Sequence, residues 1–88
     1  MKKGKAVIKN DKGIHARPSS IISLESQRFQ SDITLINDGK TASSKDVLQI
    51  IILELFKGVE VEVTVEGEDE EEAYNKVIEL LEKEYEFD

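Results

Sequence analysis

The sequence predicts an α+β domain in which helices cover one face of an antiparallel sheet, with the element order β-α-β-β-α-β-α. Two observations support this fold class. Residues 59–66 alternate as a half-exposed strand does. Residues 68–81 place apolar side chains at helical spacing, and residues 16–29 place a more polar set at the same spacing. Strands and helices also follow one another at short intervals, which is typical of α+β domains. Because the chain has 88 residues, we expect one compact domain over residues 1–88.

The first strand and the first helix are predicted from side-chain spacing. Residues 4–9 alternate so that Ala6 and Ile8 face one side of a strand. Residues 10–13 then turn the chain. From residue 16 to about residue 29, helical spacing brings a rather polar set of side chains onto one face. This set is Pro18, Ile22, Ser26 and Phe29.

A hairpin and a further strand are predicted next along the sheet. Residues 32–43 alternate apolar and polar side chains around Asp38-Gly39, a dipeptide typical of the tight turn between two strands. Residues 59–66 alternate valine with glutamate or threonine, which indicates a strand with one face exposed to water.

The two remaining segments differ in clarity. In residues 46–58, "DVLQIIILELFKG", the β-branched run favours a strand, whereas the length and the closing glycine favour a helix, and local reasoning leaves both open. Residues 68–72 are acidic and suit the positive end of a final helix. The acidic tail, residues 82–88, would lie at the negative end, so we expect it to fray and assign it no function.

The composition excludes several functional classes. Twelve basic and nineteen acidic residues give a net charge of −7, the wrong sign for binding nucleic acid or anionic lipid, so protein partners are expected. The chain contains no cysteine, which removes disulfides and thiol chemistry. We see no signal peptide, no membrane-spanning run and no metal or cofactor site, and we expect a soluble cytoplasmic protein.

The single histidine, His15, lies where a helix is predicted to begin. A surface or capping role is one interpretation. In a helix that starts here, the N–H groups of Ala16 and Arg17 lack intrahelical partners and form an anion site beside the ring. Pro18 fits the first turn because it has no N–H. The helix dipole and the Arg17 guanidinium both disfavour an imidazolium, which leaves a nucleophilic ring that can attack phosphorus.

The same donors would stabilise a phosphoryl group on the ring through charge-assisted hydrogen bonds. The sequence shows no second histidine and no glycine-rich phosphate loop, so a self-contained catalyst is not evident. We therefore expect one protein to place the group on His15 and another to remove it.

Four features follow one another along the chain: "GIHARPSS", the hairpin with "NDGKT", the run ending in "KG" and the acidic final helix. Together they resemble HPr, the histidine-containing phosphocarrier of the bacterial phosphoenolpyruvate-dependent sugar phosphotransferase system. The resemblance covers nearly the whole chain. It implies an open-faced β-sandwich, a four-stranded antiparallel sheet with three helices on one face, and a helix over residues 46–56. It also implies that enzyme I phosphorylates Nδ1 of His15, that Arg17 accompanies the phosphohistidine, and that enzyme IIA proteins collect the group without any cofactor. The chain would then be a monomeric protein substrate with no turnover of its own.

The resemblance further implies a shared apolar docking surface for enzyme I and the IIA proteins around the histidine. Its residues here are Ile21, Leu24, Val47, Leu48, Ile51, Ile52 and Phe56. Plain core packing is the alternative, and it stays open above all for Val47 and Phe56. For Ile21, Leu24, Leu48 and Ile51 a docking role is favoured, since large apolar residues beside a reactive group usually mark a partner site.

One position departs from the family pattern. Gram-positive members carry a regulatory serine before the second helix, and alignment places Asp46 there. We hypothesise that serine-kinase regulation is absent, with Ser43 and Ser44 as poor substitutes; a helix N-cap is the simpler role for Asp46. An HPr-like regulatory module that acts through docking, including one in a nitrogen-type branch, is the alternative function. A nucleic-acid-binding domain is disfavoured by the charge balance.

Overall fold

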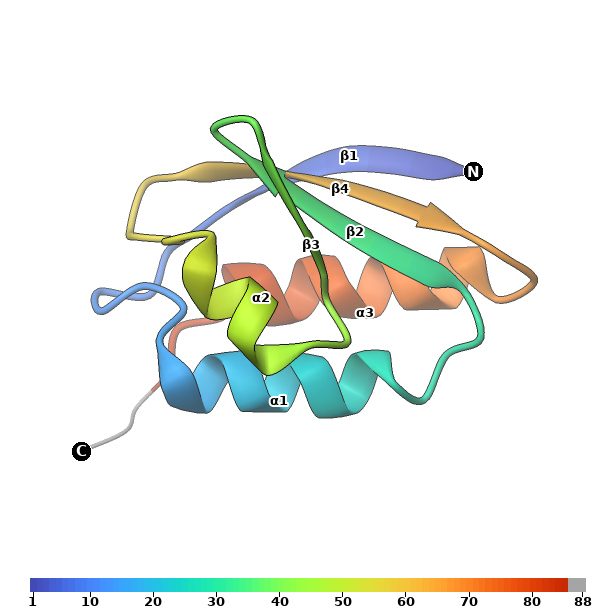
Figure 1. Ribbon diagram of the computed structural model, residues 1–88, viewed down its shortest axis with the longest axis horizontal. Coiled ribbons are helices and arrows are strands. Elements are labelled where there is room, and N and C mark those ends of the chain that lie inside the picture. Colours follow the sequence, from blue (N-terminus) through green and yellow to red (C-terminus); the bar gives the residue numbers. More distant parts are fainter. Residues whose placement is uncertain (86–88) are drawn as a thin grey trace.

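The computed structural model describes residues 1–85, and its strands and helices follow the predicted order (Figure 1). Their bounds are β1 Lys2–Val7, α1 Ala16–Ser26, β2 Asp32–Asn37, β3 Lys40–Ser43, α2 Val47–Ile52, β4 Glu60–Glu66 and α3 Glu70–Glu82.

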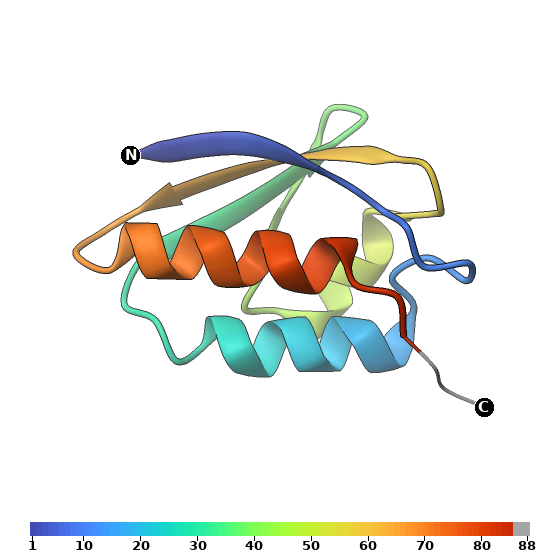
Figure 2. The same cartoon turned by 180° about the vertical axis from the view of Figure 1, so that it is seen from behind.

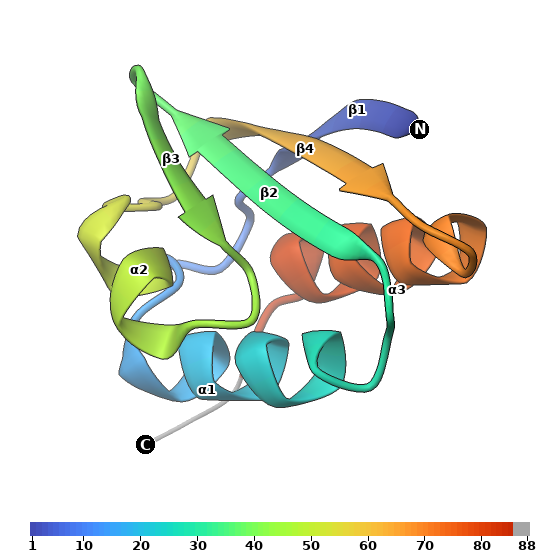
Figure 3. The same cartoon turned by 45° about the vertical axis from the view of Figure 1, so that its right-hand side comes forward.

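One antiparallel sheet of four strands, in the order β1-β4-β2-β3, forms one layer of the molecule. The three helices lie together on one side of it, with α1 and α3 side by side and α2 near the β3 edge (Figures 1 and 3). The predicted fold class, including the open sheet with its helices on one face, is confirmed.

The core lies between the sheet and the helices. Along β4, Val61, Val63 and Val65 are buried while the intervening glutamates are exposed, as the alternation predicts. In β1 the side chains of Ala6 and Ile8 also face the core. Because β1 pairs with β4 from Lys2↔Val65 onward, the strand begins and ends two residues earlier than the predicted range 4–9.

Helix α1 packs through an unusually polar face, as its sequence predicts. Ser19, Ser23 and Ser26 are buried beside Ile22. Two of these hydroxyls bond to the segment before α2: Ser23 Oγ donates to the Lys45 carbonyl oxygen at 2.7 Å, and Ser26 Oγ accepts from Ser44 Oγ at 2.8 Å. Buried polar groups of this kind are tolerated because they are hydrogen-bonded.

The predicted end of α1, near residue 29, is wrong by about one turn. The N–H groups of Arg28 and Phe29 bond to carbonyls only three residues back, which tightens and ends the helix. The next two N–H groups, of Gln30 and Ser31, donate to the Asp69 carboxylate at 2.9 Å. These hydrogen bonds to the N-cap of α3 hold the turn that leads from α1 to β2.

The hairpin between β2 and β3 is confirmed. Asp38 and Gly39 both adopt positive φ, 52° and 78°, the conformation that a two-residue hairpin turn requires and that this dipeptide favours.

Helix α2 is shorter than the implied helix over residues 46–56, because it ends at Ile52. Glu54 takes the left-handed conformation, with φ of 55°, before Gly58 is reached. Leu53 and Leu55, on either side of Glu54, are both buried, whereas a continued helix would point side chains two residues apart in nearly opposite directions. The Leu55 carbonyl oxygen also accepts a hydrogen bond from Ile14 N at 2.8 Å, which holds this segment against the loop before α1.

Helix α3 ends at Glu82, and the chain then runs back toward the start of α1 (Figure 2). Tyr85 N donates to Asn10 Oδ1 at 2.7 Å, and Tyr85 Oη donates to the Leu80 carbonyl oxygen at 2.7 Å. Fraying was predicted for residues 82–88, of which residues 86–88 lie outside the described part of the chain.

Candidate functional site

His15 occupies the N-cap of α1, with extended backbone angles (φ −87°, ψ −162°). Its carbonyl oxygen accepts the first intrahelical bond, from Ser19 N at 2.9 Å. The predicted start of the helix is confirmed, so the N–H groups of Ala16 and Arg17 have no carbonyl within the helix to bond. Pro18 stands at the third helical position, where an N–H would have lacked an intrahelical partner as well.

The backbone just before His15 is held in place by the segment after α2 and by the first turn of α1. Ile14 N donates to the Leu55 carbonyl oxygen, and Ser19 Oγ donates to the Ile14 carbonyl oxygen at 3.3 Å. Gly13 has φ of +70°, and a Cβ there would lie 2.5 Å from the Leu55 carbonyl oxygen. This residue must therefore be glycine for both conformational and steric reasons.

The imidazole of His15 is half-buried and lines a surface hollow of about 180 Å³. The hollow is lined by Lys12, Ile14, His15, Ile51, Glu54, Leu55 and Phe56. A second, shallower hollow of about 330 Å³ lies over the first turn of α1 and is lined by Ala16, Arg17, Ser20 and Ile21. The ring thus lies at the surface, between helix residues on one side and the α2 segment on the other.

Large apolar side chains that the fold leaves exposed lie mostly on α1 and on the segment 47–56, and two of them, Ile51 and Phe56, line the hollow with the ring. Among the described residues, seven large hydrophobic side chains are exposed, and five of them come from α1 or the segment 47–56. These five are Leu24, Leu48, Ile51, Ile52 and Phe56. We call them, together with the half-buried Ile21 and Val47, the α1–α2 apolar surface.

One face of α2 carries two members of this surface, and one of them reaches the hollow beside His15. Leu48 and Ile51 are three residues apart and share one face of α2, and Ile51 lines the hollow with the ring. The core positions of this segment are different residues, Ile50 and Leu53 among them. Phe56, for which core packing was an open alternative, is 61% exposed, whereas Val47 stays intermediate.

Asp46 is the N-cap of α2, as the simpler interpretation predicts. Its carboxylate accepts hydrogen bonds from Gln49 N at 3.2 Å and Gln49 Nε2 at 3.3 Å. Of the two nearby serines, Ser44 is fully buried and Ser43 is half-buried, with its hydroxyl oxygen accepting from Lys45 N.

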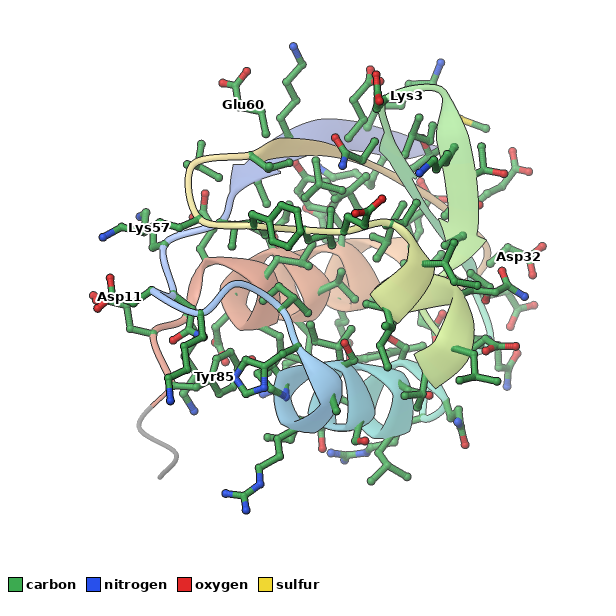
Figure 4. The ribbon with its side chains drawn as sticks, turned by 60° about the vertical axis from the view of Figure 1, so that its left-hand side comes forward. Lys3, Asp11, Asp32, Lys57, Glu60 and Tyr85 are labelled. Carbon is green, nitrogen blue, oxygen red and sulfur yellow. The ribbon has the colours of Figure 1, made fainter. Side chains whose placement is uncertain are left out.

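An ion pair joins the turn before α1 to the turn before β4. Lys57 Nζ lies 2.7 Å from Asp11 Oδ1, and the two side chains point toward each other in Figure 4. The hydrogen bond from Lys57 lowers the pKa of the Asp11 carboxyl. Both groups are exposed, so the pair contributes little stability.

Sequence reasoning singled out His15 and Arg17 as site residues but did not place Lys12, Glu54 or Leu55 beside them. Lys12 lines the hollow from the turn before α1, and Glu54 and Leu55 line it from the segment that follows the end of α2 at Ile52. Within residues 1–85 no cluster of three metal-ligating side chains is present, and no helix has the length and apolar character that crossing a bilayer demands.

Comparison with known sequences finds matches over nearly the whole chain. The family model described as "PTS HPr component phosphorylation site" matches residues 2–83. The phosphocarrier protein HPr of Borreliella burgdorferi is 39% identical over 82 residues, which cover 93% of this chain and 95% of that protein.

Solved structures agree with the sequence matches. The crystal structure of HPr from Bacillus anthracis is similar with a TM-score of 0.88 and 30% identity, over 92% of this chain and 96% of that one. The Bacillus subtilis catabolite repression protein Crh, reported as a dimer with a swapped domain, is similar with a TM-score of 0.74 and 33% identity, over 92% and 93% of the two chains.

Proposed function

The chain belongs to the HPr family of phosphocarriers, and we propose that it accepts a phosphoryl group from phospho-enzyme I on His15 and passes it to enzyme IIA proteins during sugar uptake. The observation that supports this proposal most directly is the position of the His15 imidazole at the surface. His15 lines a surface hollow at the N-terminus of α1, beside the exposed α1–α2 apolar surface.

The transfer needs a nucleophilic nitrogen and a place for the incoming charge. In the neutral tautomer with its proton on Nε2, Nδ1 of His15 carries a lone pair that attacks phosphorus. The Nδ1–P bond forms as the bond between phosphorus and enzyme I breaks, and its electron pair stays with enzyme I. The transferred oxygens then accept hydrogen bonds from the N–H groups of Ala16 and Arg17, helped by the helix dipole and the Arg17 guanidinium.

The same arrangement allows the group to leave again. Phosphohistidine at an accessible helix end is stabilised without being enclosed, so a second nucleophile on a IIA protein can reach the phosphorus from solvent. The chain acts as a protein substrate with a phosphohistidine intermediate, and the energy of each transfer comes from its partners.

Partners dock, in this proposal, on the α1–α2 apolar surface. Exposed apolar side chains of this number on a small domain usually mark a protein interface. Because the family is that of a phosphotransferase system, its partners are the proteins of that system. We assign one docking surface to both enzyme I and the IIA proteins, since each must bring its own reactive group to the same ring.

A transfer assay tests the proposal. The chain is mixed with enzyme I, Mg²⁺ and labelled phosphoenolpyruvate, and the protein-bound label is tested for acid lability. We expect acid-labile label in the native chain and none in His15→Ala. Label that is acid-stable, or that persists in His15→Ala, would overturn the assignment.

A regulatory binding module is the second candidate function, including one in a nitrogen-type branch of the system. The likeness to Crh, a protein of catabolite repression, supports it. His15 discriminates between the two functions, because a module that only docks has no use for the ring. A partner that binds native chain and His15→Ala equally, with no phosphoryl transfer in either, would favour the regulatory function.

Serine-kinase regulation is absent in this proposal. Asp46 stands at the position of the regulatory serine and cannot be phosphorylated by a serine kinase, while its carboxylate caps α2. Ser44 is buried and hydrogen-bonded to Ser26, which makes it a poor kinase substrate. Incubation with HPr kinase and ATP should leave the chain free of serine phosphate; stoichiometric phosphoserine would refute this.

We further place the protein in the cytoplasm, where its proposed donor and acceptors would be, and treat it as a monomer that binds neither nucleic acid nor membrane. Sedimentation at micromolar concentration should give the mass of one chain, 9.9 kDa. A dimer would instead point to the exchange of segments reported for Crh.

A further inference from the structure

Asn10 is one of few buried polar side chains in the described part of the chain, and both ends of its amide are used. It is 4% exposed. Nδ2 donates to the Gly13 carbonyl oxygen at 2.8 Å, and the main-chain carbonyl oxygen of Asn10 accepts from Gly13 N at 2.8 Å. These two bonds close the turn that ends two residues before His15, so the side chain of Asn10 fixes where this turn places the ring.

The other end of the Asn10 amide binds a segment 75 residues away in sequence. Oδ1 accepts the N–H of Tyr85 at 2.7 Å. Tyr85 is itself fixed by its phenol, which donates to the Leu80 carbonyl oxygen, and by packing against the core. Figure 4 shows Tyr85 beside the first turn of α1, and Figure 2 shows the segment after α3 descending to the same place.

From this connection we propose that Asn10 is a positioning residue for phosphoryl transfer at His15, and that Tyr85 sets its orientation, so that the segment following α3 controls the geometry of the reactive loop. The inference rests on the proposed phosphocarrier function. It adds a residue outside the "GIHARP" motif and a second segment to the site.

The physical argument compares the bonds that hold this loop. On the α2 side the loop is held by Ile14 N and the Leu55 carbonyl oxygen. On the opposite side the Asn10 side chain closes the turn through the Gly13 carbonyl oxygen and joins it to the C-terminal segment through Tyr85 N. Without its amide, the turn loses its hydrogen bond to the C-terminal segment and keeps the bond at Ile14 and the exposed Lys57–Asp11 ion pair. An exposed ion pair holds the turn only weakly, so the ring samples more orientations. Misplacement of reacting atoms by about 1 Å can cost on the order of a hundredfold in rate.

Two variants of Asn10 separate its two bonds. Asn10→Ala removes both, whereas Asn10→Asp keeps an acceptor for Tyr85 N and loses the donor to Gly13 while keeping the side-chain size. Asp69→Ala is the matched control: it removes hydrogen bonds to Gln30 and Ser31 at the far end of α1 (Figure 1) and lowers stability without touching the loop.

A second pair of variants tests the part played by Tyr85. Tyr85→Ala loses the ring but keeps the N–H, whereas Tyr85→Pro loses both. The ratio of their transfer rates therefore isolates the bond to Asn10. Thermal unfolding of every variant is recorded alongside the kinetics.

The measurement is transfer from phospho-enzyme I at varied concentrations of the chain. We expect Asn10→Ala and Asn10→Asp to lower the maximal rate about tenfold with KM changed by less than about twofold, because the docking surface is untouched. Tyr85→Pro should be slower than Tyr85→Ala, and Asp69→Ala should transfer at the native rate. If Asn10→Ala does not fold, Asn10→Asp carries the test.

Three results would overturn the inference: Asn10 variants as fast as Asp69→Ala, a loss confined to KM, or equal rates for the two Tyr85 variants. A native chain that takes no phosphoryl group would overturn the phosphocarrier function and this inference together. If the native chain accepts the phosphoryl group and the Asn10 variants accept it at the native rate, only this inference would be overturned.

Discussion

Replacing Leu48 by serine separates docking from folding, because this side chain contributes little to the core. Leu48 is 71% exposed. Full burial of a leucine is worth about 1.5–3 kcal/mol, so the share that Leu48 buries on folding is worth at most ~1 kcal/mol. For a domain of this size, that corresponds to a fall in Tm of no more than about 8 °C.

In the complex with enzyme I the remaining surface of Leu48 would be buried. By the same area argument this burial is worth up to ~2 kcal/mol, so we expect Leu48→Ser to raise KM for transfer about tenfold. Ile51→Ser should act in the same direction with a larger stability cost, since Ile51 is 39% exposed. In Leu48→Ser the maximal rate should change little, because His15, its loop and the hollow beside it are unaltered.

Leu53→Ala is the matched control, since Leu53 lies in the same segment but is 2% exposed. Truncation of a buried leucine costs about 2–5 kcal/mol, so this variant should lose far more in Tm than Leu48→Ser. The reasoning is refuted if Leu48→Ser melts as low as Leu53→Ala, or if its KM equals that of the native chain.

Three further predictions concern stability. Gly13→Ala should lower the free energy of unfolding by more than about 1 kcal/mol in urea melts, because the added Cβ meets the Leu55 carbonyl oxygen at positive φ; an unchanged midpoint would contradict this. Burial raises the pKa of Tyr85 to about 12, above its ordinary value of 10.0, so the unfolded chain loses this proton first. Stability should hold below pH ~10 and fall between about pH 10 and 12, and Tyr85→Phe should flatten that fall. The hydrogen bond from Ser31 lowers the pKa of Asp69 below its ordinary value of 3.8. The stabilisation by the Asp69 carboxylate is therefore present above pH ~3.8 and is lost as the pH falls through the lowered pKa. In Asp69→Asn the free energy of unfolding should fall less steeply with decreasing pH than in the native chain; an identical fall would contradict a stabilising role for these hydrogen bonds.

The strands were predictable because each one faces water on one side. In residues 59–66 the alternation of valine and glutamate reports that environment directly, and Asp38-Gly39 marks the hairpin through local conformational preference. The start of α1 at His15 was predictable for a similar reason, since the proline limits how early a helix can begin.

The end of α2 was not predictable from local pattern. Residues 50–55 are almost uniformly apolar, so spacing cannot tell which of them face the core. The helix ends at Ile52, and the segment after it is held by a hydrogen bond between Leu55 and Ile14, two residues 41 positions apart in the sequence. The same holds for the bond between Asn10 and Tyr85. Neither residue has a local signal, and only the fold brings them together.

The reactive ring itself gives the most direct test of the account. The native chain is incubated with phospho-enzyme I and examined by NMR of its single histidine together with ³¹P NMR. We expect one phosphorus per chain, bonded to Nδ1 of His15, and its disappearance when a IIA protein is added. A ring that stays unmodified under these conditions, or a phosphoryl group found on any other side chain, would contradict the account.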